Sequence, residues 1–102
     1  MHRISNHYLF NRAQALILDL ILEHWSAIRI ELLKNTMEQV PLNGAALDKQ
    51  TLINILVDDL TELSQRRKEM LLVDNARAEE LREEIAQGHR YIINGLLANF
   101  AF

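Results

Sequence analysis

Ala15-Leu16-Ile17-Leu18-Asp19-Leu20-Ile21-Leu22 is the stretch that decides the fold, because seven of its eight residues are apolar. A helix with one buried face shows apolar residues at i, i+3, i+4 and i+7. One such stripe runs through this stretch and its flanks: Phe10, Ala13, Ile17, Leu20, Ile21, His24 and Ile28. A second apolar stripe lies beside it: Leu18, Leu22, Trp25 and Leu32 or Leu33. The rest of the chain is too short to cover both stripes, so we expect the second one to face another chain.

The composition indicates one small all-α domain spanning residues 1–102. Hydrophobic residues make up 49% of the chain and charged residues 25%, which is too apolar for a disordered protein. Three glycines and one proline provide few of the turns that a sheet needs. Leucine is abundant whereas valine is rare, which favours helix over strand.

The apolar pattern predicts an elongated antiparallel bundle of three helices, over residues 6–38, 46–73 and 76–99. Residues 1–5 are expected to be flexible, with Ser5 or Asn6 as the N-cap of the first helix. Pro41 and Asn43-Gly44 end that helix, because proline cannot continue it and Asn-Gly favours a turn with positive φ.

The second and third predicted helices carry apolar seams. The members of the second are Leu52, Leu56, Leu60, Leu63, Arg67 and Met70, and those of the third are Ala78, Leu81, Ile85, His89, Ile92 and Leu96. Arg67 either lays its stem over apolar surface or pairs with a carboxylate, and we favour the first reading. Gly88 and Gly95 share one side, which marks a close approach by another helix or, for Gly95, a helix end.

The junction between these two helices is either a short turn, capped by Asp74 or Asn75, or part of one rod. No Gly or Pro interrupts the chain there, so we expect a continuous or merely kinked helix.

Charge and composition exclude several partners. The net charge is −3 and the one basic run is Arg66-Arg67-Lys68, so we expect no nucleic acid. There is no cysteine, and the N-terminus lacks the apolar core of a signal peptide. The apolar run at 15–22 falls short of the roughly 20 residues that span a bilayer. We therefore expect a soluble, cytoplasmic protein without membrane contact.

No residue pattern indicates catalysis or a cofactor. His2, His7, His24 and His89 lack metal-ligand spacing. No serine lies in a strand–turn–helix elbow, and the glycines are too isolated for a phosphate loop. We expect neither an enzyme nor a metal or cofactor site.

The apolar surplus instead predicts a surface for a protein partner. The candidate residues are the second stripe and the C-terminal tail: Leu18, Leu22, Trp25, Leu33, Leu97, Phe100 and Phe102. They either receive an apolar helix of a client or are buried inside a monomeric bundle or a homodimer.

The order of these features resembles the FliT-type flagellar export chaperones. Three segments carry the resemblance: 16–31 with its Trp-x-x-Ile step, 52–63 followed by Arg66 or Arg67, and Gly88 with Tyr91 and Gly95. The resemblance implies a cytoplasmic helical chaperone that holds a filament-cap-like client before export. That family usually has a further C-terminal helix that regulates access, and residues 96–102 would take its place here.

Two alternatives stay open. One is a chaperone or subunit of another type III secretion system. The other is a structural homo-oligomer whose apolar stripes meet only each other.

Overall fold

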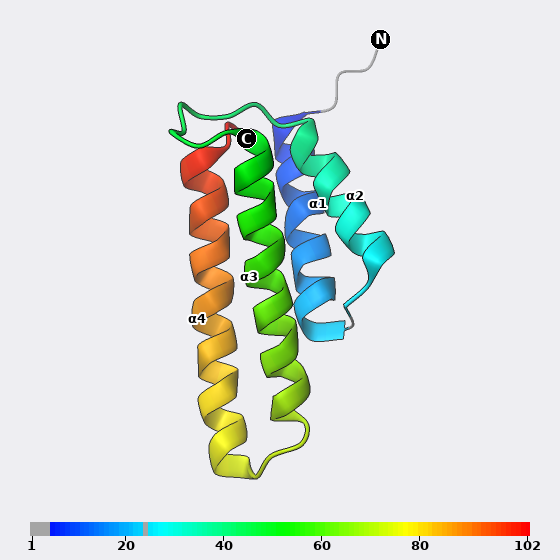
Figure 1. Cartoon of the computed structure of the whole chain (residues 1–102), viewed down its shortest axis with the longest axis vertical. Coiled ribbons are helices and arrows are strands. Elements are labelled where there is room, and N and C mark those ends of the chain that lie inside the picture. Colours follow the sequence, from blue (N-terminus) through cyan, green and yellow to red (C-terminus); the bar gives the residue numbers. More distant parts are fainter. Residues whose placement is uncertain (1–4, 24) are drawn as a thin grey trace.

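Residues 5–23 and 25–102 are described by the structure, a computed structural model, and they contain four α-helices. Their bounds are α1 Asn6–Leu18, α2 Ala27–Glu38, α3 Lys49–Met70 and α4 Asn75–Asn99, and a π-helical turn, η1 Asp19–Glu23, continues α1. The helices form two antiparallel hairpins, α1–α2 and α3–α4, in a body of 52 × 27 × 20 Å (Figure 1). The all-α class is confirmed, whereas the count of three helices is wrong.

The predicted single helix over residues 6–38 is wrong because the chain reverses between η1 and α2. Ser26 has an extended backbone, and its Oγ accepts a hydrogen bond from the N–H of Arg29 at 3.4 Å, which makes it the N-cap of α2. The reversal buries Leu33, a candidate member of the second apolar stripe, together with Met37, whereas Leu18 and Leu22 of that stripe stay exposed. Burying this apolar area favours the hairpin over a rod.

α3 and α4 are separate helices, so the continuous or merely kinked helix that we expected is wrong. The carboxylate of Asp74 accepts a hydrogen bond from the N–H of Arg77 at 3.0 Å, so Asp74 caps α4. The chain between Met70 and Asp74 forms a turn, which ends α3 before the predicted residue 73.

The loop between α2 and α3 lies where Pro41 and Asn43-Gly44 predict it. Gly44 has a φ of +66°, a left-handed conformation that glycine adopts without the steric cost of a Cβ. The loop ends at Asp48, whose Oδ1 accepts a hydrogen bond from the N–H of Thr51 at 2.7 Å and caps α3.

One core runs through both hairpins, with α3 as the central helix. α3 packs against α4 on one side and against η1 and α2 on the other (Figure 1). The predicted seams are confirmed by burial of Leu56, Leu60 and Leu63 on α3 and of Leu81, Ile85, Ile92 and Leu96 on α4. Ile28, which we expected on the buried stripe, is 74% exposed because the helix that would turn it inward ends before it.

Residues 99–102 form a strap that ties the end of α4 to the loop after α2. The N–H of Asn43 donates to the carbonyl of Asn99 at 2.9 Å, and the N–H of Ala101 donates to the carbonyl of Pro41 at 2.8 Å. The C-terminal tail therefore packs back onto the bundle.

The α3–α4 hairpin extends beyond the end of α1–α2 (Figure 1). Leu81, near the α3–α4 turn, is fully buried yet lies outside the main core cluster. This overhanging end is two helices thick.

Candidate interaction surface

An apolar groove lies between the N-terminal half of α3 and the C-terminal half of α4. Its volume is about 420 Å³. Its more open lining residues are Leu47, Leu52, Ile55, Tyr91, Gly95 and Ala98, and its buried ones are Leu56, Ile92, Leu96 and Phe100. We refer to it as the hairpin groove.

Helical spacing brings these side chains together. Leu52, Ile55 and Asp59 are three and four residues apart, so they share one side of α3. Tyr91 and Gly95 are likewise one turn apart on α4. A Cβ added to Gly95 would meet no atom within 4 Å, so its missing side chain leaves the groove open instead of serving packing within the chain.

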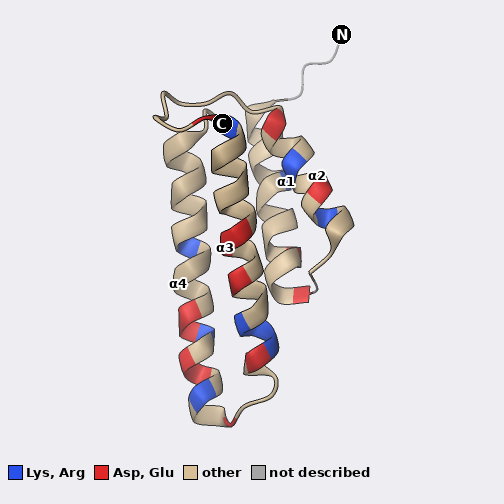
Figure 2. Cartoon of the chain, in the orientation of Figure 1, with Lys and Arg blue, Asp and Glu red and all other residues tan. Residues whose placement is uncertain are grey.

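Three large apolar side chains of the groove are open to solvent. Leu47 is 48% exposed, Ile55 44% and Tyr91 72%. Residues 50–57 and 91–102 include no charged residue, and the corresponding turns of α3 and α4 are tan in Figure 2. Asp48 and Lys49, where α3 begins, are the charged residues at this end of α3. Exposed apolar surface that is gathered in one place marks an interaction site in many soluble proteins.

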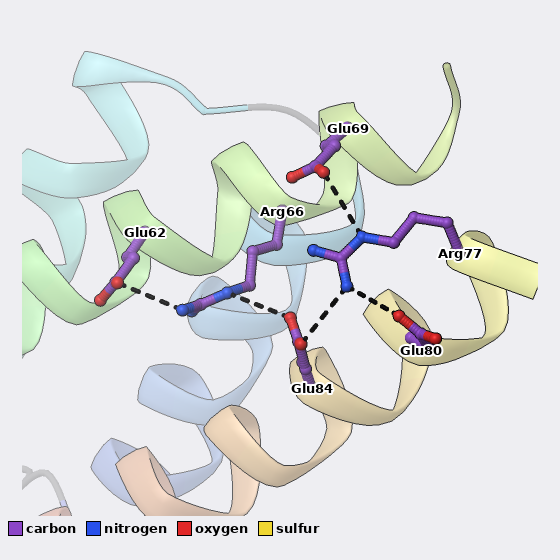
Figure 3. A network of polar contacts seen from close by, with 6 residues as sticks. All are labelled: Glu62, Arg66, Glu69, Arg77, Glu80 and Glu84. Atoms are coloured by element: carbon purple, nitrogen blue, oxygen red, sulfur yellow. Dashed lines mark hydrogen bonds and ion pairs between the residues drawn. The ribbon is translucent and has the colours of Figure 1, made fainter. Parts of the chain in front are cut away.

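The opposite end of the same hairpin carries an ion-pair network (Figure 3). Arg66 on α3 pairs with Glu62 at 3.2 Å and with Glu84 on α4 at 3.5 Å. Arg77 pairs with Glu69, Glu80 and Glu84 at 3.6, 3.0 and 3.7 Å. These side chains are 35–66% exposed, so each pair contributes only about 0–1 kcal/mol to stability.

Asp59 lies where the hairpin groove meets the charged end. It also lines a second hollow of about 530 Å³, which extends to Glu62 and Arg66. Burial raises the pKa of the Asp59 carboxyl above its ordinary value, and the carboxylates of Glu62 and Asp58 raise it further.

The structure divides the residues that we predicted to bind a partner between surface and core. Leu18, Leu22 and Leu97 are 39%, 51% and 49% exposed. Trp25 and Phe102 are half-buried and pack against the core.

Leu33 and Phe100 are core residues, although Phe100 also lines the floor of the hairpin groove. Leu33 is 0% exposed because the reversal before α2 turns it inward. Phe100 is 4% exposed because the strap folds it back over the bundle.

A second exposed apolar set lies on the α1–α2 hairpin, and we call it the α1–α2 patch. Its members, Leu18, Leu22, Ile28 and Leu32, are 37–74% exposed. An ion pair between Asp19 and Arg29, at 3.9 Å, joins the two helices next to Leu18 and Ile28. The patch therefore keeps Leu18 and Leu22 of the predicted stripe, includes Leu32 rather than Leu33 of its two alternatives, and adds Ile28.

Leu47 and Ile55 were not among the predicted surface residues, and Tyr91 entered the predictions only through the family resemblance. A signal for Ile55 and Tyr91 was present, because the chain has no charge over residues 50–57 and 91–102, whereas Leu47 is followed by Asp48 and Lys49 and has no such signal. A helical surface without charge over two or more turns indicates that something covers it.

The remaining polar candidates form no catalytic or metal-binding arrangement among residues 5–23 and 25–102. His7 is exposed, and His2 and His24 lie outside the described residues. Burial lowers the pKa of His89, the charge of Arg90 lowers it further, and its Nε2 has no hydrogen-bond partner in this part of the chain. Here no three His, Asp or Glu side chains come together as metal ligands.

Arg67 forms no ion pair within the described ranges, and its Nη1 is buried without a hydrogen-bond partner there. The side chain as a whole is half-buried. The described residues therefore give no support to the alternative that Arg67 pairs with a carboxylate.

No helix in the described part of the chain has the length and apolar character to cross a membrane. No family model, curated protein or solved structure matches this chain. Two surfaces, the hairpin groove and the α1–α2 patch, thus stand as the candidate sites on their geometry alone.

Proposed function

We propose that this protein is a chaperone that holds an apolar helical segment of a client protein in the hairpin groove. The observation that carries the proposal is that Leu47, Ile55 and Tyr91 stay 44–72% exposed along one groove whose lining is mostly apolar. An amphipathic helix binds such a groove through apolar side chains spaced one turn apart. The concave groove supports this role better than the α1–α2 patch does.

The energetics favour reversible binding. Fully burying one Leu or Ile side chain contributes about 1.5–3 kcal/mol. Association costs about 4–15 kcal/mol in lost translational and rotational freedom. The groove side chains are already partly buried, so they and their client counterparts gain an amount of the same order as that cost. A near balance of this kind suits a protein that must release its client.

The resemblance to FliT-type flagellar export chaperones supports a narrower form of the proposal. In that form the client is a filament-cap-like protein and binding takes place in the cytoplasm. Leu52, Ile55 and Tyr91 of the groove fall within or beside the segments that carry the resemblance. A chaperone or subunit of another type III secretion system would use the same groove.

Two matched variants, Ile55→Asp and Leu22→Asp, test which surface binds the client. Both replace an aliphatic side chain that is about half exposed on a helix, at 44% and 51%, so their cost in folding is similar. With a purified flagellar filament-cap protein as the probe, we expect Ile55→Asp to weaken binding about tenfold or more. We expect Leu22→Asp to bind within about twofold of wild type. Fluorescence anisotropy measures the affinity, and circular dichroism checks the fold.

The opposite ranking of the two variants would place the client on the α1–α2 patch. Absence of binding by the wild type would contradict the flagellar form of the proposal. A tight dimer in light scattering that Ile55→Asp dissociates would show that the groove joins two copies of this chain. The protein would then be a structural homo-oligomer and the chaperone proposal would be wrong.

A further inference from the structure

We propose that the client helix carries a lysine or arginine that binds between Asp59 and Tyr91, one turn beyond the apolar residues in the hairpin groove. This inference rests on the proposed function and names the chemistry of the client. The expected partner is an amphipathic helix with a basic residue at one end of its apolar face.

The position of Asp59 on α3 sets this spacing. Asp59 follows Ile55 by four residues, which is about 6 Å along the helix axis. Both residues line the groove. A helix that lies along the groove rises at the same rate, so the side chain one turn from the residue facing Ile55 reaches Asp59.

The carboxylate of Asp59 forms no ion pair with any residue that the structure describes. Within residues 5–23 and 25–102, Arg66 follows Asp59 on α3 and forms its ion pairs with Glu62 and Glu84, at 3.2 and 3.5 Å. No ion pair within 4.0 Å includes Asp59 in these ranges, and Asp58 and Glu62 add negative charge beside it. A wholly apolar occupant would remove water from this carboxylate without compensating its charge. An ammonium or guanidinium group supplies that compensation.

Tyr91 supplies a second attraction for the same cation. Its side chain is 72% exposed, and it lines both the groove and the adjoining hollow together with Asp59. A cation over a tyrosine ring is attracted by the negative face of the π-system. Carboxylate and ring stand on opposite helices, so a basic side chain at this point contacts both walls.

Three synthetic helical peptides test the inference. Each has about 15 residues, enough to span the chain from 47 to 59. They share leucines at i, i+3 and i+4, the spacing of Leu52, Ile55 and Leu56, and differ only at i+7, which holds Lys, Gln or Glu. Fluorescence anisotropy measures their affinities for the wild type, Asp59→Asn and Asp58→Asn.

With the wild type we expect the Lys peptide to bind about tenfold tighter than the Glu peptide, with the Gln peptide between them. Asp59→Asn brings the three within about twofold of one another. Asp58→Asn keeps the wild-type ranking, because neighbouring helical residues point about 100° apart and Asp58 is exposed and does not line the groove.

Tyr91→Leu separates the role of the ring from that of apolar contact. We expect it to reduce the advantage of the Lys peptide while the Gln peptide keeps its affinity, since leucine preserves apolar surface.

Equal binding of the three peptides to the wild type would overturn the inference and leave the proposed function standing. A Lys preference that survives in Asp59→Asn would overturn it as well. Binding of none of the peptides would contradict the proposed function itself, and the inference with it.

Discussion

Gly88 shows how one residue sets the distance between two helices. A Cβ built on it would lie 2.5 Å from Cδ2 of Leu63, and 3.1 and 3.3 Å from Cδ1 and Cγ. α4 can approach α3 this closely only because the side chain is missing. The close approach predicted from the two glycines is confirmed at Gly88, whereas Gly95 faces open space.

We expect Gly88→Ala to lower the free energy of unfolding by about 1 kcal/mol. Overpacking against Leu63 costs about 1–3 kcal/mol, which outweighs a gain of about 1 kcal/mol in helix propensity. Gly95→Ala is the matched control, and it should raise the free energy of unfolding by up to about 1 kcal/mol because nothing opposes the propensity gain. Urea denaturation measures both. Equal gains would show that Leu63 moves aside at no cost.

Individual residues were predictable where their role is local. Ser5 and Asp74 cap helices, and each needs only an N–H three residues further along the chain. Leu33 was not predictable in this way, because its burial depends on the reversal at Ser26 and on what the reversed helix then packs against.

Whole elements were predictable where an apolar period runs on for several turns. The seams of α3 and α4 follow such a period, and their burial agrees with it. Residues 6–38 were read as one helix because no Gly or Pro interrupts them. A short side-chain cap at Ser26 is enough to start a new helix when the hairpin buries more apolar area than a rod does.

A distance between two labels tests the reversal. The chain has no cysteine, so Asn11→Cys and Glu38→Cys provide two unique sites for spin labels. One continuous helix would separate them by about 40 Å. We expect a much shorter distance in double electron–electron resonance, because α2 returns along α1 (Figure 1).

The pair Glu80→Cys and Leu97→Cys is the control, because both positions are exposed on the uninterrupted α4 and should lie about 25 Å apart. A separation near 40 Å for the first pair would contradict the hairpin.

At the scale of the whole molecule, the strap closes the bundle. Leu42 and Phe100 pair as an isolated antiparallel bridge, and the ring of Phe102 meets that of Phe10 edge-on with centroids 5.0 Å apart. Asn6 Nδ2 also donates a hydrogen bond to the carbonyl of Ala101 at 3.0 Å. The first and last helices are thus held together at one end.

Deleting residues 100–102 should therefore lower stability rather than free a binding site. Loss of the buried Phe100 side chain alone costs about 3–5 kcal/mol. Because Phe100 also lines the hairpin groove, client affinity should fall with it. Leu97→Ala is the control, since its 49% exposed side chain should cost little. A truncated protein that stays stable and binds the client more tightly would show that the tail covers the groove.

The general shape was predictable from the sequence, and the groove was not. Long amphipathic helices with few turn residues indicate an elongated antiparallel body. Which faces stay uncovered depends on how two hairpins pack together, and that is a property of the assembled chain. Ile55 and Leu56 are adjacent and both apolar, yet one is 44% exposed and the other 5%.

The overhanging end of α3–α4 has a mechanical consequence. Its two helices have no third layer to support them, and surface ion pairs that salt screens help to hold them together. Such a region opens at a lower free-energy cost than the part that shares the main core. The end of the α3–α4 hairpin near Leu81 can therefore open locally while the other end, several turns away near Leu52 and Leu96, stays closed.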